Sequence, residues 1–272
     1  MLLPLPGPSC SRVSSLVSQI HPTQTVLVTS DVHLGAISFE QEMAFRTWLE
    51  QAAEIASRIV FNGDLFDFWF EYQWGNTRGH DVTLLQLREI VDAGVPITLM
   101  GGNHDWWGGR YLREEIGLDF HLDFHQDPFI TKLAGFKTLL AHGDGLGTGD
   151  LRYRAARLLL RGSVTRFAFG ILPPALGDLI ANGVSHTKDR EQAPDAKALE
   201  RATALEAWAI KELKAQSDLD LLLLGHTHVP KIIDVGNRQW YINTGDWVYH
   251  RSFALLRDGE IPRLIEWTGS IP

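Results

Sequence analysis

The chain has 272 residues, of which 44% are hydrophobic and 21% charged, and its formal net charge is −8. This composition is ordinary for a globular protein with a full core, and the acidic balance argues against binding to nucleic-acid backbone, which favours a basic surface. The single cysteine, Cys10, excludes an intrachain disulfide and a thiolate metal site, so any metal would be held by His, Asp, Glu or Asn. A single cysteine also fits a reducing compartment, and no apolar run is long enough to cross a bilayer, so we expect a cytoplasmic protein.

The elements begin after an N-terminal arm, residues 1–24, which is rich in Pro and Ser and predicted to be loosely ordered. Short apolar runs predict strands at residues 25–29, 58–61, 96–100, 136–141 and 219–224. Helical spacing of apolar residues predicts helices at residues 39–56, 82–93 and 195–217. From Lys231 to Trp267, short apolar runs alternate with turn residues, which predicts antiparallel strands that close a sheet.

A different pattern covers residues of about 150–190, where helical spacing is interrupted by glycine and proline and no strand is evident. We therefore expect one domain, residues 25–272, with a small helical insertion that covers the core as a cap. Large apolar residues in this insertion, among them Phe167, Phe169 and Ile171, either pack on the core or offer an apolar pocket.

Polar side chains follow five of the predicted strands, at the point where each strand ends. The five clusters are Asp31 and His33; Asp64 and Asp67; Asn103, His104 and Asp105; His142 and Asp144; and His226 and His228. Because ligand sites of open α/β sheets gather beyond the carboxyl ends of the strands, five such ends predict one site. A lone His after a strand is usually a satisfied polar residue, but that explanation would need the same coincidence at every strand end.

The clusters supply enough ligands for two metal ions. One ion could be held by Asp31, His33, Asp64 and His228. The other could be held by Asp64, Asn103, His142 and His226, with the Asp64 carboxylate shared. Mixed oxygen and nitrogen ligands suit Mn, Fe or Zn, and we expect Mn²⁺. Two ions roughly 3.5–4 Å apart clamp the attacking and leaving oxygens of an in-line displacement, and a hydroxide bridging them would be a nucleophile at neutral pH.

Two residues beside the ligands are candidates for catalysis. His104 adjoins Asn103, so its side chain could stabilise charge on phosphoryl oxygens or protonate a leaving group. Asp105 could fix the tautomer and orientation of His104. Asp67 and Asp144 are expected to position ligands from behind.

These clusters resemble the five motifs of calcineurin-like metallophosphoesterases, in the order that the family has. The motifs are Asp31-Val-His33, Gly63-Asp64-Leu65-Phe66-Asp67, Gly102-Asn103-His104-Asp105, His142-Gly143-Asp144 and Gly225-His226-Thr227-His228. The resemblance implies a four-layer αββα sandwich with a dinuclear site at the strand ends, and it supports the ligand sets given above.

Within that superfamily, the chain is most similar to UDP-2,3-diacylglucosamine hydrolases. The similarity rests on the run Phe66-Asp67-Phe68-Trp69, on the stretch from His142 to Arg154, and on the helical insertion. It implies hydrolysis of a lipid A precursor at the α-phosphate, which gives UMP and 2,3-diacylglucosamine 1-phosphate. Asp150 and Tyr153 match positions that contact substrate in that family. The best-known branch has Arg where His104 stands.

Arg154 belongs to a helix face with Arg157 and Arg161, which could meet a diphosphate or anionic lipid headgroups, or could simply be solvated. An apolar cap would also allow peripheral contact with the inner face of the membrane. The aromatic residues around Trp69 and Trp107 either pack under the loops or contact substrate.

Two alternatives remain at this stage. A phosphomonoesterase or phosphodiesterase acting on a soluble substrate would use the same metal ligands but would need no apolar channel. A non-catalytic scaffold with this fold is disfavoured, because such proteins typically lose metal ligands and here all seven are present.

Overall fold

The computed structural model describes residues 24–73, 75–77, 79–121, 129–147, 162–173 and 196–272. Most of the predicted N-terminal arm and much of the predicted cap lie outside these residues. The expected substrate contacts Asp150, Tyr153 and Arg154 lie outside them as well.

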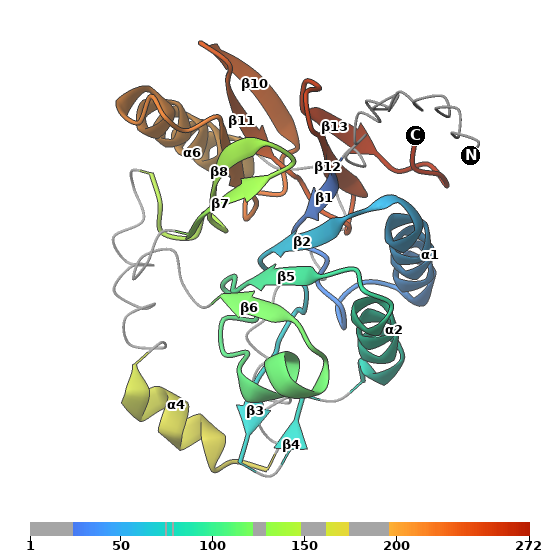
Figure 1. Ribbon diagram of the computed structural model, residues 1–272. Coiled ribbons are helices and arrows are strands. Elements are labelled where there is room, and N and C mark those ends of the chain that lie inside the picture. The colour runs from blue at the N-terminus through green and yellow to red at the C-terminus, as the bar shows by residue number, and fades with distance from the viewer. Residues whose placement is uncertain (1–23, 74, 78, 122–128, 148–161, 174–195) are drawn as a thin grey trace, which may run out of the picture.

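Two sheets form the centre of the molecule (Figure 1). In the first sheet the strand order is β13 (Arg263–Glu266), β12 (Ser252–Arg257), β1 (Thr25–Thr29), β2 (Arg58–Asn62), β5 (Ile97–Met100) and β6 (Asp119–His121). In the second sheet the order is β10 (Lys231–Gly236), β11 (Gln239–Asn243), β9 (Leu221–Leu224), β8 (Phe136–Leu140) and β7 (Phe129–Leu133). Strands β1, β2, β5 and β6 run parallel, as do β8, β9 and β11.

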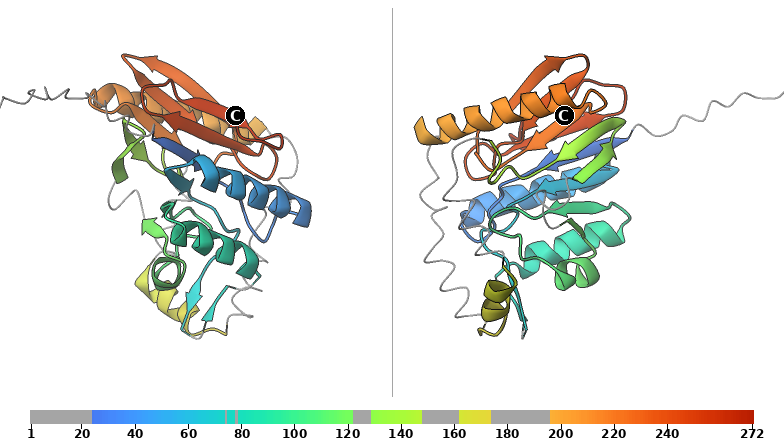
Figure 2. Two further views of the ribbon diagram at one scale, coloured as in Figure 1. Left: turned by 45° about the vertical axis from the view of Figure 1, so that its right-hand side comes forward. Right: turned by 90° about the vertical axis from the view of Figure 1, so that its left-hand side faces the viewer.

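Helices cover the outer face of each sheet, as the two views in Figure 2 make clear. Helices α1 (Phe39–Ile55) and α2 (Asp81–Asp92) lie on the first sheet, and α6 (Ala196–Ala215) lies on the second. The side chain of Ser38 accepts from the backbone N–H of Gln41, and the Gln41 side chain accepts from the backbone N–H of Ser38, which fixes where α1 begins.

Three apolar clusters separate these four layers. Because side chains alternate along a strand, Leu27 of β1 faces α1, where it packs in the same cluster as Phe45 and Trp48. Its neighbours Val26 and Val28 face the second sheet. On the far side of that sheet, Leu222 packs with Leu205 and other residues of α6. The predicted four-layer αββα sandwich is confirmed.

The chain after Lys231 departs from the expected single run of antiparallel strands. Strands β10 and β11 form an antiparallel pair in the second sheet, where β11 lies parallel to β9, whereas β12 and β13 form an antiparallel pair in the first. The segment between Asn243 and Ser252 therefore crosses from one sheet to the other. Alternating apolar residues specify a strand and its buried face, but not the strand beside it.

One helix of the predicted insertion, α4 (Ser163–Gly170), lies against the short hairpin of β3 (Glu71–Tyr72) and β4 (Gly75–Asn76). The backbone N–H of Gln73 donates to the carbonyl oxygen of Gly170 at 3.0 Å. The Phe169 ring packs on Phe70 and Trp107, each with ring centroids 5.7 Å away. A single turn of π-helix, Tyr111–Glu115, lies nearby. Among the described helices, none combines the length and apolar composition that a membrane span requires.

Candidate metal centre

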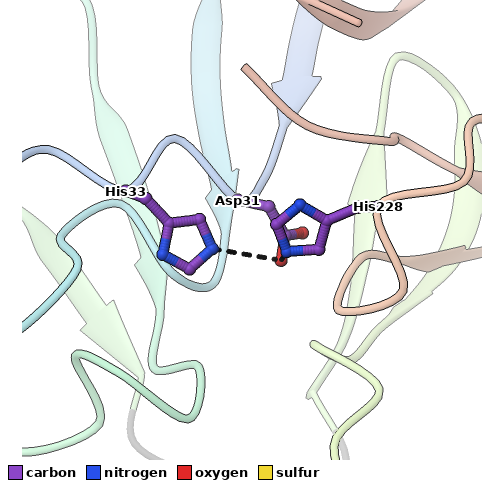
Figure 3. Close-up of side chains that lie close together, drawn as sticks. All are labelled: Asp31, His33 and His228. Carbon is purple, nitrogen blue, oxygen red and sulfur yellow. Dashed lines mark ion pairs between the residues drawn. The ribbon is translucent and has the colours of Figure 1, made fainter. Parts of the chain in front are cut away.

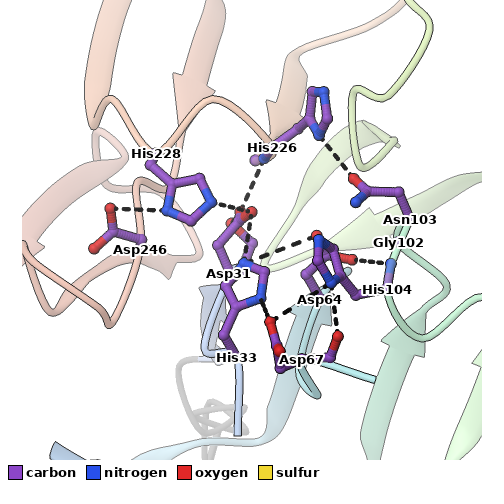
Figure 4. Close-up of polar contacts among 12 residues, drawn as sticks. Asp31, His33, Asp64, Asp67, Gly102, Asn103, His104, His226, His228 and Asp246 are labelled. Carbon is purple, nitrogen blue, oxygen red and sulfur yellow. Dashed lines mark hydrogen bonds and ion pairs between the residues drawn. The ribbon is translucent and has the colours of Figure 1, made fainter. Parts of the chain in front are cut away.

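The loops that follow β1, β2, β5, β8 and β9 meet at one edge of the two sheets (Figure 4). Positive φ angles, between 53° and 67°, occur at Asp31, His33, Asp64, His226 and His228. Residues other than glycine rarely adopt this left-handed conformation, which costs about 1–3 kcal/mol per residue and concentrates at functional sites. The fold therefore holds these five residues in a backbone conformation that non-glycine residues do not favour on their own.

Glycines beside the ligands leave room for this convergence. A Cβ atom at Gly102 would overlap the carboxylate of Asp64, and one at Gly225 would lie 2.5 Å from Asp31 Oδ2. Gly63 is restricted in the same way by the His142 ring and also has a positive φ of 93°. These close approaches explain why the motifs carry glycine at these points.

A first group of donor atoms comes from Asp31, His33 and His228 (Figure 3). Asp31 Oδ1 lies 3.8 Å from His33 Nε2 and 3.3 Å from His228 Nε2. Asp64 Oδ2 lies 3.9 Å from His33 Nε2 on the other side. Asp31 Oδ1 and His33 Nε2 are buried and have no hydrogen-bond partner among the described residues. Orphaned buried acceptors of this kind fit a cation, since burying them unpaired is costly.

A second group of donor atoms lies on the other side of Asp64. His142 Nε2 is 3.1 Å from Asp64 Oδ2 and 3.2 Å from Asn103 Oδ1. His226 Nδ1 is 2.9 Å from the same Asn103 oxygen. Asp64 Oδ2 thus belongs to both groups, and the structure brings together all seven side chains that the sequence suggested as ligands. Carboxylate, amide and imidazole donors of this kind suit divalent Mn, Fe or Zn.

Comparison with known proteins identifies the family. The model of the calcineurin-like phosphoesterase family matches residues 24–230. The chain belongs to this family. It is a metal-dependent hydrolase that acts on phosphate esters or acid anhydrides.

The relatives of this phosphoesterase carry a more specific name. It is 29% identical over 249 residues to a UDP-2,3-diacylglucosamine hydrolase from Porphyromonas gingivalis, with 85% of this chain and 93% of that protein covered. It is 30% identical over 243 residues to a UDP-2,3-diacylglucosamine hydrolase from Xanthomonas oryzae pv. oryzae, with 87% and 96% covered. A solved structure of Vacuolar Protein Sorting 29 from Cryptosporidium parvum is also similar, at a TM-score of 0.43 and 16% identity, over 90% of this chain and 98% of that one.

The buried carboxylates and histidines of the phosphoesterase centre shift each other's pKa values. Burial alone would raise the pKa of Asp31, but the charges of His228 and His142 lower it to about 2. Burial alone would lower the pKa of His33, but the Asp31 and Asp67 carboxylates raise it to about 9. The pKa of His142 is raised well above its ordinary value, despite burial, chiefly by the charge of Asp64. Metal ligation requires neutral imidazoles, so a cation that binds here displaces these protons.

His104 lies at the edge of the first group. Its Nδ1 is 2.6 Å from the carbonyl oxygen of Asp67, and because a carbonyl only accepts, Nδ1 carries the hydrogen. Burial lowers the pKa of His104, which favours the neutral form of its ring. Its backbone N–H donates to Asp64 Oδ1 at 2.8 Å. The two parts of His104 therefore have separate partners. Its ring donates to the Asp67 carbonyl, and its backbone N–H donates to the Asp64 carboxylate.

The expected role of Asp105 needs correction. Its carboxylate accepts from the backbone N–H groups of Gly102, Asp64, Leu65 and Phe66 at 2.7–3.3 Å, and it is not the group that orients His104. The carbonyl of Asp67 takes that role instead. Burial and the charge of Asp64 raise the pKa of Asp105 to about 6. Asp105 thus joins the loop that carries Asn103 to the loop that carries Asp64.

Other polar groups lie behind the ligands. Asp67 Oδ1 lies 3.2 Å from His33 Nδ1, as expected of a residue that positions a ligand, and the buried Asp144 contributes charge that raises the pKa of His142. Three such groups were missed from the sequence: Ser30, whose hydroxyl donates to Asp31 Oδ2; Asn62, whose carbonyl faces His142 Nδ1; and Asp246, which faces His228. Asp246 comes shortly after β11, so the same rule that found the five clusters, a polar side chain after a strand, could have identified it from the sequence.

The aromatic residues near the centre divide into two sets. Trp69 is fully buried and packs with Phe66 and Tyr111, which is the behaviour of a core residue. Phe70 and Trp107 instead contact Phe169 of α4. These two rings therefore link the loops of the phosphoesterase centre to the one described helix of the insertion.

Proposed function

We propose that the phosphoesterase hydrolyses UDP-2,3-diacylglucosamine at its α-phosphorus and releases UMP and 2,3-diacylglucosamine 1-phosphate. The observation that carries the chemistry is the pair of donor groups that share Asp64 Oδ2. The observation that supports this substrate is the similarity, over more than four-fifths of the chain, to relatives that bear the name of this hydrolase.

In this proposal each donor group holds one divalent ion, with Mn²⁺ as the first candidate. Asp31, His33 and His228 would hold one ion, and Asn103, His142 and His226 would hold the other, with Asp64 available to both. When bound, the two ions would supply Lewis acidity and a water acidic enough to react at neutral pH. A bond forms between the water oxygen and the α-phosphorus, and the anhydride bond breaks so that the bridging oxygen stays with the sugar phosphate.

His104 is the residue of this chain that we assign to the reacting phosphate. With its Nδ1 hydrogen held by the Asp67 carbonyl, only Nε2 remains to exchange a proton with substrate or solvent. A ring of this kind can stabilise a phosphoryl oxygen or the departing oxygen once it is protonated. Asp105 acts at a distance, because it fixes the loops on which Asn103, His104 and Asp64 stand.

The outer face of α4 supports a lipid substrate over a soluble one. Phe167 of α4 and Ile171, the residue that caps its C-terminus, are 72% and 54% exposed, while Phe169 on the same helix packs on Phe70 and Trp107. Large exposed apolar side chains on a helix beside a catalytic centre suit acyl chains or a membrane surface better than water. We therefore include peripheral contact with a membrane through α4 in the proposal.

The test is metal-dependent release of UMP. Purified protein would be incubated with Mn²⁺ and UDP-2,3-diacylglucosamine, beside the variants Asp64→Asn and Asp234→Asn. Asp64→Asn keeps a carbonyl for the backbone N–H of His104 but loses the bridging charge. Asp234 is exposed on β10, so its variant controls for the loss of one carboxylate.

We expect UMP from the wild type and from Asp234→Asn, and a loss of at least about a hundredfold in Asp64→Asn, because both ions depend on that carboxylate. Parallel reactions would contain p-nitrophenyl phosphate and bis-p-nitrophenyl phosphate. Turnover of these esters without UMP release would retain the dinuclear chemistry and replace the lipid substrate with a soluble one. Metal binding without any turnover would favour a scaffold.

A further inference from the structure

Asp246 lies directly behind His228, on the segment that crosses from β11 to β12 (Figure 4). Its side chain is only 2% exposed. Asp246 Oδ2 is 3.2 Å from His228 Nδ1 and 3.2 Å from His250 Nδ1. On the opposite side of the His228 ring, Nε2 lies 3.3 Å from Asp31 Oδ1 in the first donor group.

We infer that Asp246 is a positioning residue that fixes the tautomer of His228 and so determines whether the first donor group can bind its ion. A carboxylate accepts hydrogen bonds but does not donate them, so His228 Nδ1 must carry the hydrogen. The lone pair is then left on Nε2, the atom that faces Asp31. This inference rests on the metal centre of the proposed function, and it adds a residue that none of the five motifs contains.

The other histidines of the centre that present Nε2 have an acceptor behind them as well. His33 Nδ1 lies 3.2 Å from Asp67 Oδ1, and His142 Nδ1 lies 3.0 Å from the carbonyl oxygen of Asn62. An acceptor on the remote nitrogen is how proteins orient imidazole ligands and raise their basicity. Asp246 completes this arrangement for His228.

The two oxygens of Asp246 have separate partners, which makes the role testable. Oδ1 accepts from the backbone N–H groups of Tyr249 and His250, at 2.6 and 2.9 Å, and thereby holds the turn that precedes β12. Oδ2 faces the Nδ1 atoms of His228 and His250 and accepts from both imidazoles. Asp246→Asn can keep a carbonyl at Oδ1 and so keep the turn, while it places an NH₂ group, a donor, against His228 Nδ1.

With a donor behind it, His228 would shift its hydrogen to Nε2, where it blocks ligation. The same change behind the catalytic histidine of a serine protease leaves the geometry intact and enforces the wrong tautomer. The matched control is His250→Ala, which removes the second imidazole from the same oxygen and leaves the Asp246–His228 contact in place.

The experiment measures metal binding without substrate. Chelator-treated wild type, Asp246→Asn and His250→Ala would be dialysed against graded Mn²⁺ and their bound metal counted. The melting temperature of each metal-free protein would be recorded in parallel. We expect two ions in the wild type and in His250→Ala, and in Asp246→Asn a 10–100-fold weaker affinity for one ion alone. The metal-free melting temperature of Asp246→Asn should stay close to that of the wild type.

Three results would overturn the inference. Two ions bound to Asp246→Asn with wild-type affinity would remove the role of Asp246 and leave the proposed function untouched. Weakening of both ions together with a lower metal-free melting temperature would mean that Asp246 only holds the turn. A wild type that binds no ion would contradict the metal centre and this inference together.

Discussion

At the scale of single residues, the loops after β1 and β2 hold each other in their unfavourable conformations. The backbone N–H of Asp31 donates to the carbonyl oxygen of Gly63 at 3.0 Å, and that of His33 donates to the carbonyl oxygen of Asp64 at 3.1 Å. These bonds involve main-chain atoms only, so a side-chain substitution can remove a ligand or a proton carrier while the frame remains. Preorganisation of this kind lets individual roles be separated by mutation.

The first prediction separates the catalytic role of the His104 side chain from the contact that its backbone makes with Asp64. We expect His104→Gln to lower kcat for UDP-2,3-diacylglucosamine by about 10²–10⁴-fold, the usual contribution of a general acid or base. Two metal ions should still bind, because the backbone N–H of residue 104, and not its ring, holds Asp64 Oδ1. The measurement is kcat together with metal content.

His121→Gln provides a matched control, since His121 lies on the edge strand β6, where its ring contacts Asp119 and Phe129. It should keep wild-type kcat. An unchanged kcat in His104→Gln would remove His104 from catalysis, and a loss of bound metal would reclassify it as a ligand.

At the scale of elements, local pattern predicted β1, β2, β5, β8 and β9, but it missed β3, β4, β6 and β7 and did not determine every strand's partner. The apolar run at residues 25–29 and the helix from Phe39 were predicted almost to the residue, because burial on one or both faces dictates their composition. The short edge strand β6 and the π-helical turn at Tyr111–Glu115 were missed, since three to five residues carry too little periodicity. Which sheet takes β12 depends on long-range pairing with β1.

The same limit applies to the centre. The convergence of the seven suggested ligands could be predicted from the sequence because each one follows a strand, and the topology of the fold gathers strand ends. The roles of neighbours could not be found in this way. Asn103, His104 and Asp105 are consecutive, yet they contact a histidine pair, the Asp67 carbonyl and a set of backbone amides respectively. The direction in which each of these side chains points depends on the conformation of the loop, and the periodicity of the sequence does not predict that conformation.

At this scale we predict that helix α4 contributes to binding of lipid. Replacing both Phe167 and Ile171 with Ser should weaken binding to phospholipid vesicles and raise KM for UDP-2,3-diacylglucosamine by about tenfold or more. Burying a large apolar side chain is worth about 1.5–3 kcal/mol, and both side chains are available on the surface. Turnover of bis-p-nitrophenyl phosphate should not change, because that ester needs no apolar contact. Vesicle co-sedimentation and steady-state kinetics measure the two effects.

The control for α4 is a pair of residues of matched exposure on α2. Val82 and Leu85 are 57% and 55% exposed and belong to a helix that covers the outer face of the first sheet. Serine at both of these positions should leave KM and vesicle binding unchanged. If the two serine pairs have equal effects, the result reflects general surface polarity, and α4 has no special part in lipid recognition.

At the scale of the whole molecule, the candidate metal centre lies between the two sheets and draws its candidate ligands from both. Asp31, Asp64 and Asn103 follow strands of the first sheet, whereas His142 and His226 follow strands of the second. Polar contacts already link the sheets at this edge. The Asn62 side chain donates to the carbonyl oxygens of Ala141 and Leu223, and the Ser30 and Thr244 hydroxyls are 2.7 Å apart. Bound cations would add further links at the same place.

Metal removal should therefore lower the stability of the entire fold. A ligand present at a hundred times its dissociation constant stabilises the native state by about 2.7 kcal/mol. For a domain of this size class, each kcal/mol corresponds to about 2–4 °C in Tm, so the loss of each ion to a chelator should lower Tm by about 5–10 °C. Differential scanning fluorimetry with Mn²⁺ and with EDTA measures the shift, and hydrogen exchange should place the lost protection in β1, β2, β8 and β9 together.

Asp64→Asn distinguishes this inter-sheet effect from nonspecific effects of the chelator. Asp64 Oδ2 is the atom common to both donor groups, so its loss should abolish the Mn²⁺-dependent part of Tm while the apolar clusters of the layers remain. The variant should melt at the same temperature with Mn²⁺ and with EDTA. If instead it keeps the full shift, the stabilising ions bind elsewhere on the protein. If the wild type shows no shift although it binds two ions, the sheets are held together at this edge by their own polar contacts alone.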